Sequence, residues 1–274
     1  MRTTPAFTFP RASWRLINDE AYPVQMGLAI DEVLFDEMDR PEYQGPNIIR
    51  FYQFSPPSIV VGFHQDIKEI NLQYIRETGL ELGRRITGGG AIIMGVPDVD
   101  SQLGISILVK NPSGFPVKLG SKYALLSLAL VTGLKQLGLE VQYQPNSDIT
   151  LIGKKITGQA LLSTDNMTFL HSTITIDYDL ETMLRVMKIE PDDATMERFK
   201  EKFTTIKEHC PLITMKALKQ AINAGFDLEY NTILEEIALG EDELTSAQKL
   251  VDEKHSTAAY LYNIEGATFG SCFL

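Results

Sequence analysis

The sequence predicts an α+β fold in which mixed or antiparallel sheets pack against helices. Short segments rich in β-branched and aromatic residues, typical of strands, lie on both sides of one long segment whose apolar residues recur at helical spacing. The periodic segments after residue 180 are all helical in pattern. Strands and helices therefore do not alternate one for one, which disfavours a doubly wound parallel sheet.

Two helices are predicted before residue 100. Segment 24–38 has apolar residues at intervals of three and four, which is the helical repeat. Segment 71–78 has a capping residue, Asn71, at its start and Gly79 directly after its end. Short apolar runs bounded by Gly, Pro or polar residues predict strands at 14–17, 48–51, 58–62, 80–84 and 91–94.

The clearest helix begins at Ser121, which can cap it, and ends just before Gly138. The pair Gly153-Lys154 has the composition of a hairpin turn between two strands. A later helix is bracketed by Thr214 and Gly225. The remaining expected strands are 103–109, 139–143, 149–152, 156–162 and 169–176, and the remaining helices are 180–187, 192–202, 215–224 and 241–255.

Composition limits the class of protein. The 274 residues include 25 Lys and Arg against 36 Asp and Glu, a net charge of −11, which argues against nucleic acid as a partner. The sequence contains no run of about 18 apolar residues, so no membrane span is predicted. The N-terminal residues lack the apolar core of a secretion signal, and Cys210 and Cys272 do not make a disulfide framework, so we expect a cytoplasmic location.

The domain organisation is predicted from local composition. Residues 1–13 read as a loose arm and residues 14–225 as the main α+β domain. Residues 226–274 form a short, acidic, helical segment that we expect to pack on that domain. No linker-like composition marks a boundary between them.

Two adjacent pairs of cations stand out in this acidic chain, Arg84-Arg85 and Lys154-Lys155. Both pairs lie in segments that are otherwise low in charge. An acidic protein that keeps cations in two such places is expected to use them on an anion. Two solvated surface pairs are the alternative.

The first pair opens the most informative segment, Arg84-Arg85-Ile86-Thr87-Gly88-Gly89-Gly90-Ala91. Three consecutive glycines after a strand expose backbone N–H groups that can bind phosphate or carboxylate oxygens. Arg85 adds a fixed cation and Thr87 a hydroxyl donor. The order is neither a Walker loop nor a dinucleotide fingerprint, and a plain hairpin turn is the alternative.

The second pair opens a strand with small residues. Lys155 places a positive charge beside the space that Gly158 and Ala160 leave for a ligand. His171, on the strand that follows, is a candidate for the same pocket. The alternatives are a surface hairpin with solvated lysines and a hydrogen-bonded core histidine.

These elements together resemble the lipoate–protein ligase A family, part of the biotin/lipoate ligase and acyltransferase superfamily. Members carry Arg-Arg-x-(Ser/Thr)-Gly-Gly-Gly-Ala, which residues 84–91 match. They also carry an Asp-hydrophobic pair and Gly-x-Lys-(Ile/Val)-(Ser/Thr)-Gly-x-Ala, matched at 148–149 and 153–160, and then a His and a Thr, matched by His171 and Thr173. The resemblance spans residues 14–255. It implies an α+β catalytic domain related to biotin ligases and class II synthetases.

The resemblance implies an ATP-dependent ligase that joins lipoate or octanoate, through an acyl-adenylate, to a lysine of a small carrier domain. Such carriers are the glycine-cleavage H protein and the E2 component of 2-oxoacid dehydrogenases, and the implied cofactors are ATP and Mg²⁺. Lys155 would bridge the acyl carbonyl and the α-phosphate, and Asp148 would hold Mg²⁺, a ribose or an adenine amine. The remaining implied binding residues are Arg85, Thr87, Gly88, Gly89, Gly90, Ala91, Gly158, Ala160, His171 and Thr173, with the last two on the nucleotide side.

Three alternatives stay open. Related octanoyltransferases use a cysteine thioester without ATP, but the segment before Asp148 contains no cysteine and Cys210 follows Lys155 by 55 residues, which favours the ligase. The C-terminal part is short, as in forms that need an accessory subunit for activation. Met94 stands where the family usually has a histidine, and this substitution is the one feature that favours a non-catalytic binder. Residues such as Val61, Ile92 and Leu161 are expected to sheathe the acyl chain.

Overall fold

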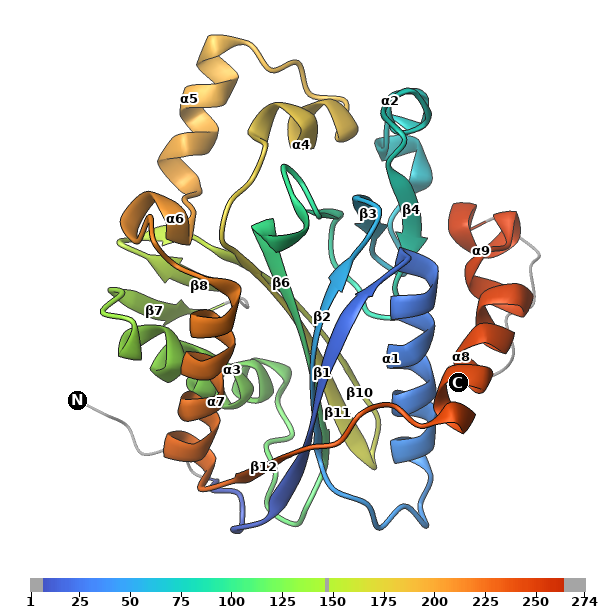
Figure 1. Cartoon of the computed structure of the whole chain (residues 1–274), viewed down its shortest axis with the longest axis vertical. Helices are drawn as coiled ribbons and strands as arrows, with labels where there is room; N and C mark the ends of the chain where they lie inside the picture. Colours follow the sequence, from blue (N-terminus) through green and yellow to red (C-terminus); the bar gives the residue numbers. More distant parts are fainter. Residues whose placement is uncertain (1–6, 146–147, 264–274) are drawn as a thin grey trace.

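The protein is built around a six-stranded mixed sheet, seen in a computed structural model that describes residues 7–145 and 148–263 (Figure 1). The described strands are β1 (Ser13–Tyr22), β2 (Ile48–Phe54), β3 (Ser58–Val61), β4 (Glu81–Arg84), β5 (Ile92–Met94), β6 (Gln102–Lys110), β7 (Val141–Gln144), β8 (Asp148–Leu151), β9 (Lys154–Lys155), β10 (Thr157–Ser163), β11 (Met167–Thr175) and β12 (Ile233–Glu236). The large sheet has the order β10-β11-β6-β2-β1-β12, with β1 parallel to both its neighbours and the other pairs antiparallel. Two smaller sheets, β4-β3-β5 and β7-β8-β9, complete the predicted α+β fold.

Helices cover both faces of the large sheet (Figure 1). The described α-helices are α1 (Val24–Asp39), α2 (Leu72–Thr78), α3 (Leu119–Gln136), α4 (Leu180–Val186), α5 (Asp193–Lys202), α6 (Ile206–His209), α7 (Met215–Tyr230), α8 (Glu241–Leu250) and α9 (Ala258–Tyr262). Short 3₁₀ turns lie at Ile67–Glu69 and Val99–Ser101, and a π-helical turn, Val251–His255, joins α8 to α9. Helices α1 and α8 pack on one face of the sheet, and α3 and α7 pack on the other. None of the described helices is both long enough and apolar enough to cross a bilayer.

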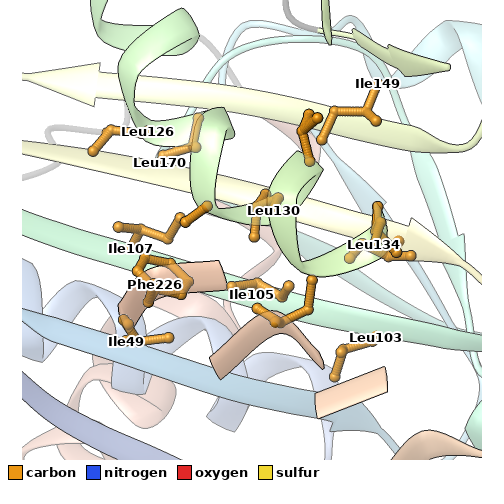
Figure 2. Packing of buried hydrophobic residues seen from close by; sticks show 14 of the residues in the cluster. Ile49, Leu103, Ile105, Ile107, Leu126, Leu130, Leu134, Ile149, Leu170 and Phe226 are labelled. Atoms are coloured by element: carbon orange, nitrogen blue, oxygen red, sulfur yellow. The ribbon is translucent and has the colours of Figure 1, made fainter. Parts of the chain in front are cut away.

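Alternation along the central strand β6 builds the core on both faces. Ile105 and Ile107 point toward α3 and α7 and pack with Phe226 of α7 (Figure 2). Leu108 points the other way, into the cluster beneath α1. Since successive side chains of a strand face opposite sides, one apolar strand contributes to two cores, and each fully buried Ile or Leu stabilises the fold by about 1.5–3 kcal/mol.

The contact between α3 and α7 corrects one predicted helix end. Helix α7 continues through Gly225 to Tyr230 instead of ending at residue 224. A Cβ on Gly225 would lie 2.0 Å from the Ala129 carbonyl oxygen, and a Cβ on Gly133 would lie 2.5 Å from that of Ala221. Gly225 is therefore required for the close approach of two helices, and the sequence pattern alone made it look like a helix stop.

Other local predictions have mixed outcomes. Asn71 caps α2 and Gly79 follows it with φ +70°, as predicted. Ser121 is not a cap, because α3 begins earlier and its N-cap is Lys118. The hairpin turn before β9 is at Ile152 and Gly153, both with positive φ, one residue before the predicted pair. The strand β12 was not predicted, because half of its residues are glutamates.

Candidate functional site

A cavity of about 380 Å³ lies between the β10–β11 hairpin, the glycine segment after β4 and the helices α4 and α5. Its lining is mostly apolar, with a few polar groups at its two ends. A concave, apolar site with a few convergent polar groups is the usual form of a small-molecule pocket. The main lining side chains are Leu28, Tyr52, Phe54, Val60, Arg85, Ile92, Lys155, His171, Thr173, Thr175, Tyr178, Met183, Met187, Phe199 and Phe203.

The pairing of β10 with β11 sets the long dimension of the cavity. Gly158 lies opposite Thr173 and Ala160 opposite His171, so these residues share the face of the hairpin that the cavity occupies. From His171 to Thr175 the strand advances about 13 Å at about 3.3 Å per residue. This length exceeds that of a fully extended eight-carbon chain, and the small residues of β10 leave room for one.

The alternation of side chains along a strand also corrects the set of residues expected to surround the acyl chain. Ile92 lines the cavity, whereas Val61 and Leu161 do not. Each of these two residues directly follows a lining residue, Val60 or Ala160, so its side chain points to the opposite face. Val61 and Leu161 instead pack in, or against, the hydrophobic clusters.

The mouth of the cavity carries an ion pair. The Lys155 Nζ lies 2.6 Å from the Asp148 Oδ1, and both side chains are about one-third exposed, at 35% and 33%. Lys155 also belongs to the lining, whereas Asp148 stands behind it on β8. Because the pair is reached by solvent, the ammonium can approach a carbonyl oxygen placed in the cavity mouth.

The glycine segment 88–90 forms a bend wrapped around Arg85. The guanidinium donates to the carbonyl oxygens of Gly88 at 2.6 and 3.1 Å, Gly90 at 2.9 Å and Val60 at 3.2 Å. Gly89 has φ +91°, which a residue with a side chain rarely adopts, and a Cβ there would lie 2.9 Å from Nη2 of Arg85. The glycines are thus needed for the bend itself and for the close approach of Arg85.

Arg85 is a buried cation, and within the described part of the chain its guanidinium donates to neutral carbonyl groups alone. Burial lowers the pKa of Arg85 to about 10. A buried charge without an opposite charge is costly, so the site favours an anion or a developing oxyanion next to Arg85. In each of the two predicted pairs of cations, only the second residue lines the cavity. Arg84 points away from the cavity, and the Lys154 Nζ donates to the Lys200 carbonyl oxygen at 2.6 Å.

A buried polar network surrounds His171, which lines the most buried part of the cavity wall. The His171 Nε2 lies 2.7 Å from Oδ2 of Asp31, and its Nδ1 lies 3.1 Å from Oγ1 of Thr87. The other Asp31 oxygen accepts from Arg50 and Ser106, each at 2.8 Å. Four elements, α1, β2, β6 and β11, are joined by this network.

The charges of the network fix the proton positions. Burial lowers the pKa of His171, so its ring is neutral, with one proton on Nε2 donated to Asp31. Burial opposes ionisation of Asp31, but the Arg50 guanidinium and His171 together hold its pKa below the ordinary value. The Nδ1 of His171 is then an acceptor and Thr87 donates its proton to it. In this structure the Thr87 hydroxyl contacts His171, and its predicted role toward a ligand stays a prediction.

The predicted site residues lie at this cavity in two groups, those that line it and those that contact a lining residue. Those that line it are Lys155, Arg85, Gly89, Gly90, Ala91, Gly158, Ala160, His171 and Thr173. Thr87, Gly88 and Asp148 do not line it, but each hydrogen-bonds or ion-pairs with a lining residue. The family resemblance implied a place for His171 on a nucleotide side, which stays a prediction; the structure places His171 opposite Ala160, five residues along the chain from Lys155.

The outer wall of the cavity was not predicted from the sequence. Met183, Met187, Phe199 and Phe203 close the cavity from α4 and its surroundings, with the rings of Phe199 and Phe203 stacked at 5.6 Å. Their helical spacing gave no signal beyond an amphipathic helix. Asp31 was also missed, although an acidic residue inside the apolar pattern of the first helix was visible in the sequence.

Two residues that supported alternatives lie away from the cavity. Met94 is fully buried in the cluster that contains Val60 and Phe54 and is not part of the lining, so it removes no polar group from the site. Cys210 packs against the core near α7 and does not line the cavity either. Cys272 lies outside the described residues. Among the residues that the structure describes, no cysteine lines the cavity.

Few of the described side chains lie close enough together to act as ligands of one metal ion. Within residues 7–145 and 148–263, no group of three His, Cys, Asp or Glu side chains is close enough together to hold a metal. Asp148, the predicted Mg²⁺ ligand, is paired with Lys155. Asp148 is thus the single predicted ligand, and Mg²⁺ that accompanies nucleotide phosphates needs only one or two carboxylates.

Comparison with known protein families and proteins agrees with this geometry. Residues 23–227 match the family model described as the lipoyl protein ligase A/B catalytic domain. Octanoyltransferase LipM of Geobacillus kaustophilus is 27% identical over 274 residues, covering 89% of this chain and 96% of that protein. Octanoyltransferase LipM of Bacillus subtilis is 26% identical, with 92% and 99% covered.

Solved structures show the same fold. The bi-partite lipoate protein ligase of Thermoplasma acidophilum, solved in a study with its E2 lipoyl domain, is similar with a TM-score of 0.80 and 25% identity over 92% of this chain and 97% of that one. A lipoate-protein ligase A bound with ATP has a TM-score of 0.79 at 24% identity, with 91% and 98% covered.

Proposed function

The chain belongs to the lipoyl protein ligase A/B catalytic domain family, and from this premise we propose that it transfers an octanoyl or lipoyl group from an already activated donor to the lysine amine of a small carrier domain. The favoured donor is an octanoyl thioester, as the names of the LipM relatives suggest. The observation that carries the proposal is the cavity: it is mostly apolar and long enough for eight carbons, with Lys155 at its solvent-exposed end.

The acyl chain is bound by burial of its methylenes. Each methylene removed from water contributes about 0.8 kcal/mol. With the chain extended along β10 and β11 toward His171, its carbonyl lies at the mouth beside Lys155. The reacting carbon is then the part of the donor that a second protein can reach.

Lys155 supplies electrostatic stabilisation to the transfer step. The carrier lysine, as a free amine, attacks the thioester carbonyl, and negative charge develops on the carbonyl oxygen. The C–N bond forms, the C–S bond breaks, and the amine proton leaves with the departing thiol. Asp148 holds the Lys155 ammonium at the mouth before the donor arrives.

No protein thiol is required for this reaction. Among the described residues no cysteine lines the cavity, and the two residues before Asp148 are Asn and Ser. We therefore propose direct transfer from donor to carrier lysine, without an acyl-enzyme. Cysteine-dependent transfer would need Cys210 to leave the core cluster that it packs against.

A second candidate is transfer from an acyl-adenylate, made from lipoate and ATP by this chain or by an accessory subunit. Arg85 favours it, because a buried guanidinium bonded to carbonyl groups would be compensated by a phosphate. The thioester stays first because the LipM relatives are named octanoyltransferases.

The acceptor is proposed to be a lipoyl carrier domain, such as the E2 lipoyl domain that accompanies the Thermoplasma acidophilum ligase. A polar groove adjoins the cavity mouth, shares Tyr178 and Phe203 with it, and contains Lys154, Lys200 and Lys207. The groove also contains Asp177 and Glu208, so its three lysines leave a small excess of positive charge, which in a chain of net charge −11 favours approach of an acidic carrier or donor at this side.

The experiment compares three donors with one apo carrier domain: octanoyl thioester, lipoate with Mg-ATP, and preformed lipoyl-adenylate. The proposal expects the thioester to acylate the carrier, with no need for ATP and with full activity in Cys210→Ala. Acylation only in the two lipoate reactions would establish the second candidate. No acylation from any donor would reject both.

A further inference from the structure

We propose that Arg84 and the C-terminal helix α9 form a brace that holds the glycine bend 88–90 in the shape that binds the acyl donor. Arg84 is thus a positioning residue: it acts on the cavity through other residues and does not touch the acyl group. The kinetic part of the test rests on the proposed function, whereas its structural part does not.

The brace begins with the hydrogen bonds of Arg84, which is 1% exposed. Its Nη1 donates to the carbonyl oxygens of Gly62 at 2.7 Å and of Phe63 and Gln65 at 3.0 Å. Its Nε and Nη2 donate to the Leu261 carbonyl oxygen at 3.1 and 2.9 Å. One buried guanidinium therefore ties the loop 62–65 to α9, and an ammonium could not reproduce this planar fork.

The loop 62–65 in turn touches the glycine bend. The Phe63 amide donates to the Thr87 carbonyl oxygen at 2.9 Å. A Cβ on Gly62 would lie 1.9 Å from the Gly89 carbonyl oxygen, so the two backbones are in direct contact. Arg85 holds the bend from the cavity side, and the loop supports it from the other side. A shift of the loop must therefore move residues that line the cavity.

The far end of the brace is fixed to α1. Within the π-helical turn that precedes α9, Lys254 and His255 both bind the Glu32 carboxylate, at 2.5 and 2.8 Å. Tyr260 of α9 is buried, and the Lys254 ammonium lies 4.8 Å from its ring centroid. Helix α9 lies beside β4 and follows the turn that packs on α1 (Figure 1). Since π turns are rare and recur at functional sites, this anchored turn supports a specific role for the segment.

Continuous contacts thus run from Glu32 through α9, Arg84 and the loop 62–65 to Gly89. The elements involved are α1, α9, β4 and the loop after β3, which are far apart in the sequence. Helix α9 is thereby part of the acyl-binding machinery, although none of its residues lines the cavity.

The test uses two full-length variants and a control. Arg84→Lys keeps the charge and removes the fork. Leu261→Pro disrupts α9, because Leu261 loses the amide that bonds to the Thr257 carbonyl. Lys249→Ala, on the exposed face of α8, is the matched control, since its ion pair is largely solvent-exposed.

The first readout is hydrogen exchange, which needs no activity. Both variants should accelerate exchange of the Phe63 and Gln65 amides and of residues 87–90, while β6 stays protected as in the wild type and in Lys249→Ala. If Arg84→Lys unfolds globally, Leu261→Pro decides. Unchanged exchange at 62–65 and 87–90 when α9 itself exchanges faster would refute the brace.

The second readout is kinetic. Arg84→Lys loses the paired donation to the Leu261 carbonyl, and we expect the KM for the acyl donor to rise about tenfold. The kcat and the KM for the carrier should stay close to wild type, because Lys155 is untouched. An equal fall of kcat with no change in KM would contradict a positioning role. If the wild type transfers no acyl group at all, the proposed function fails while the exchange result still decides the brace.

Discussion

The acyl cavity predicts a steep dependence on chain length. Shortening the acyl group of the donor from eight to six carbons removes two methylenes from the apolar lining formed by residues such as Val60 and Ile92. At about 0.8 kcal/mol for each methylene this costs about 1.6 kcal/mol, or roughly 15-fold in kcat/KM. The assay measures kcat/KM for donors of four to twelve carbons with one carrier. A ratio below about two between eight and six carbons would refute acyl binding in this cavity.

A matched pair of variants locates the closed end. Ala160 faces His171 across the hairpin on the cavity side, so Ala160→Leu should fill the inner end and shift the preference toward shorter donors. Leu161→Met lies on the same strand and faces the other way, so the preference should not change. An unaltered chain-length profile in Ala160→Leu would place the acyl chain elsewhere.

Three further predictions concern catalysis, pH and packing. Lys155→Ala should lower kcat by about 100-fold or more, with Tm unchanged because the side chain is one-third exposed; near-normal kcat would remove it from the chemistry. The pKa values of Asp31 and His171 both lie below their ordinary values, so the unfolded chain binds more protons in acid than the folded chain. The free energy of unfolding should therefore fall from pH 7 to pH 4, and it should fall less steeply in Asp31→Asn. An equal fall of the free energy of unfolding with pH in both proteins, measured by denaturant titration, would contradict this. In thermal unfolding, Gly225→Val should destabilise the protein by about 1–3 kcal/mol through the α3–α7 contact. Gly120 has open space around it, so Gly120→Ala should stabilise α3 by up to about 1 kcal/mol. Equal effects of the two substitutions would argue against close helix packing.

Much of this architecture was predictable from local pattern. Helical periodicity located α1, α3 and α7, and short apolar runs located the strands around β6, which is buried on both faces. The glycine bend and Lys155 were recognisable because they combine residue types that a plain core does not need. The family resemblance implied that the two share one site, and the structure places both in the lining of one cavity.

Other features could not be predicted because long-range contacts determine them. Arg84 and Arg85 are neighbours of the same type, yet alternation along the chain directs one toward α9 and the other toward the cavity. Gly225 carries the usual signal for a helix end, but α3 needs it as a contact point. The aromatic residues of α5 have helical spacing whether they face a core or a ligand. In each case the decisive partner lies many residues away.

The most direct test of acyl transfer at Lys155 follows the masses of both proteins through a single turnover with stoichiometric octanoyl thioester. Direct transfer predicts that the carrier gains one octanoyl group on one lysine while the mass of the enzyme stays constant, and that Lys155→Ala abolishes the gain on that time scale. A transient increase in enzyme mass, or a carrier that stays unmodified with the thioester, would contradict direct transfer in the Lys155 cavity.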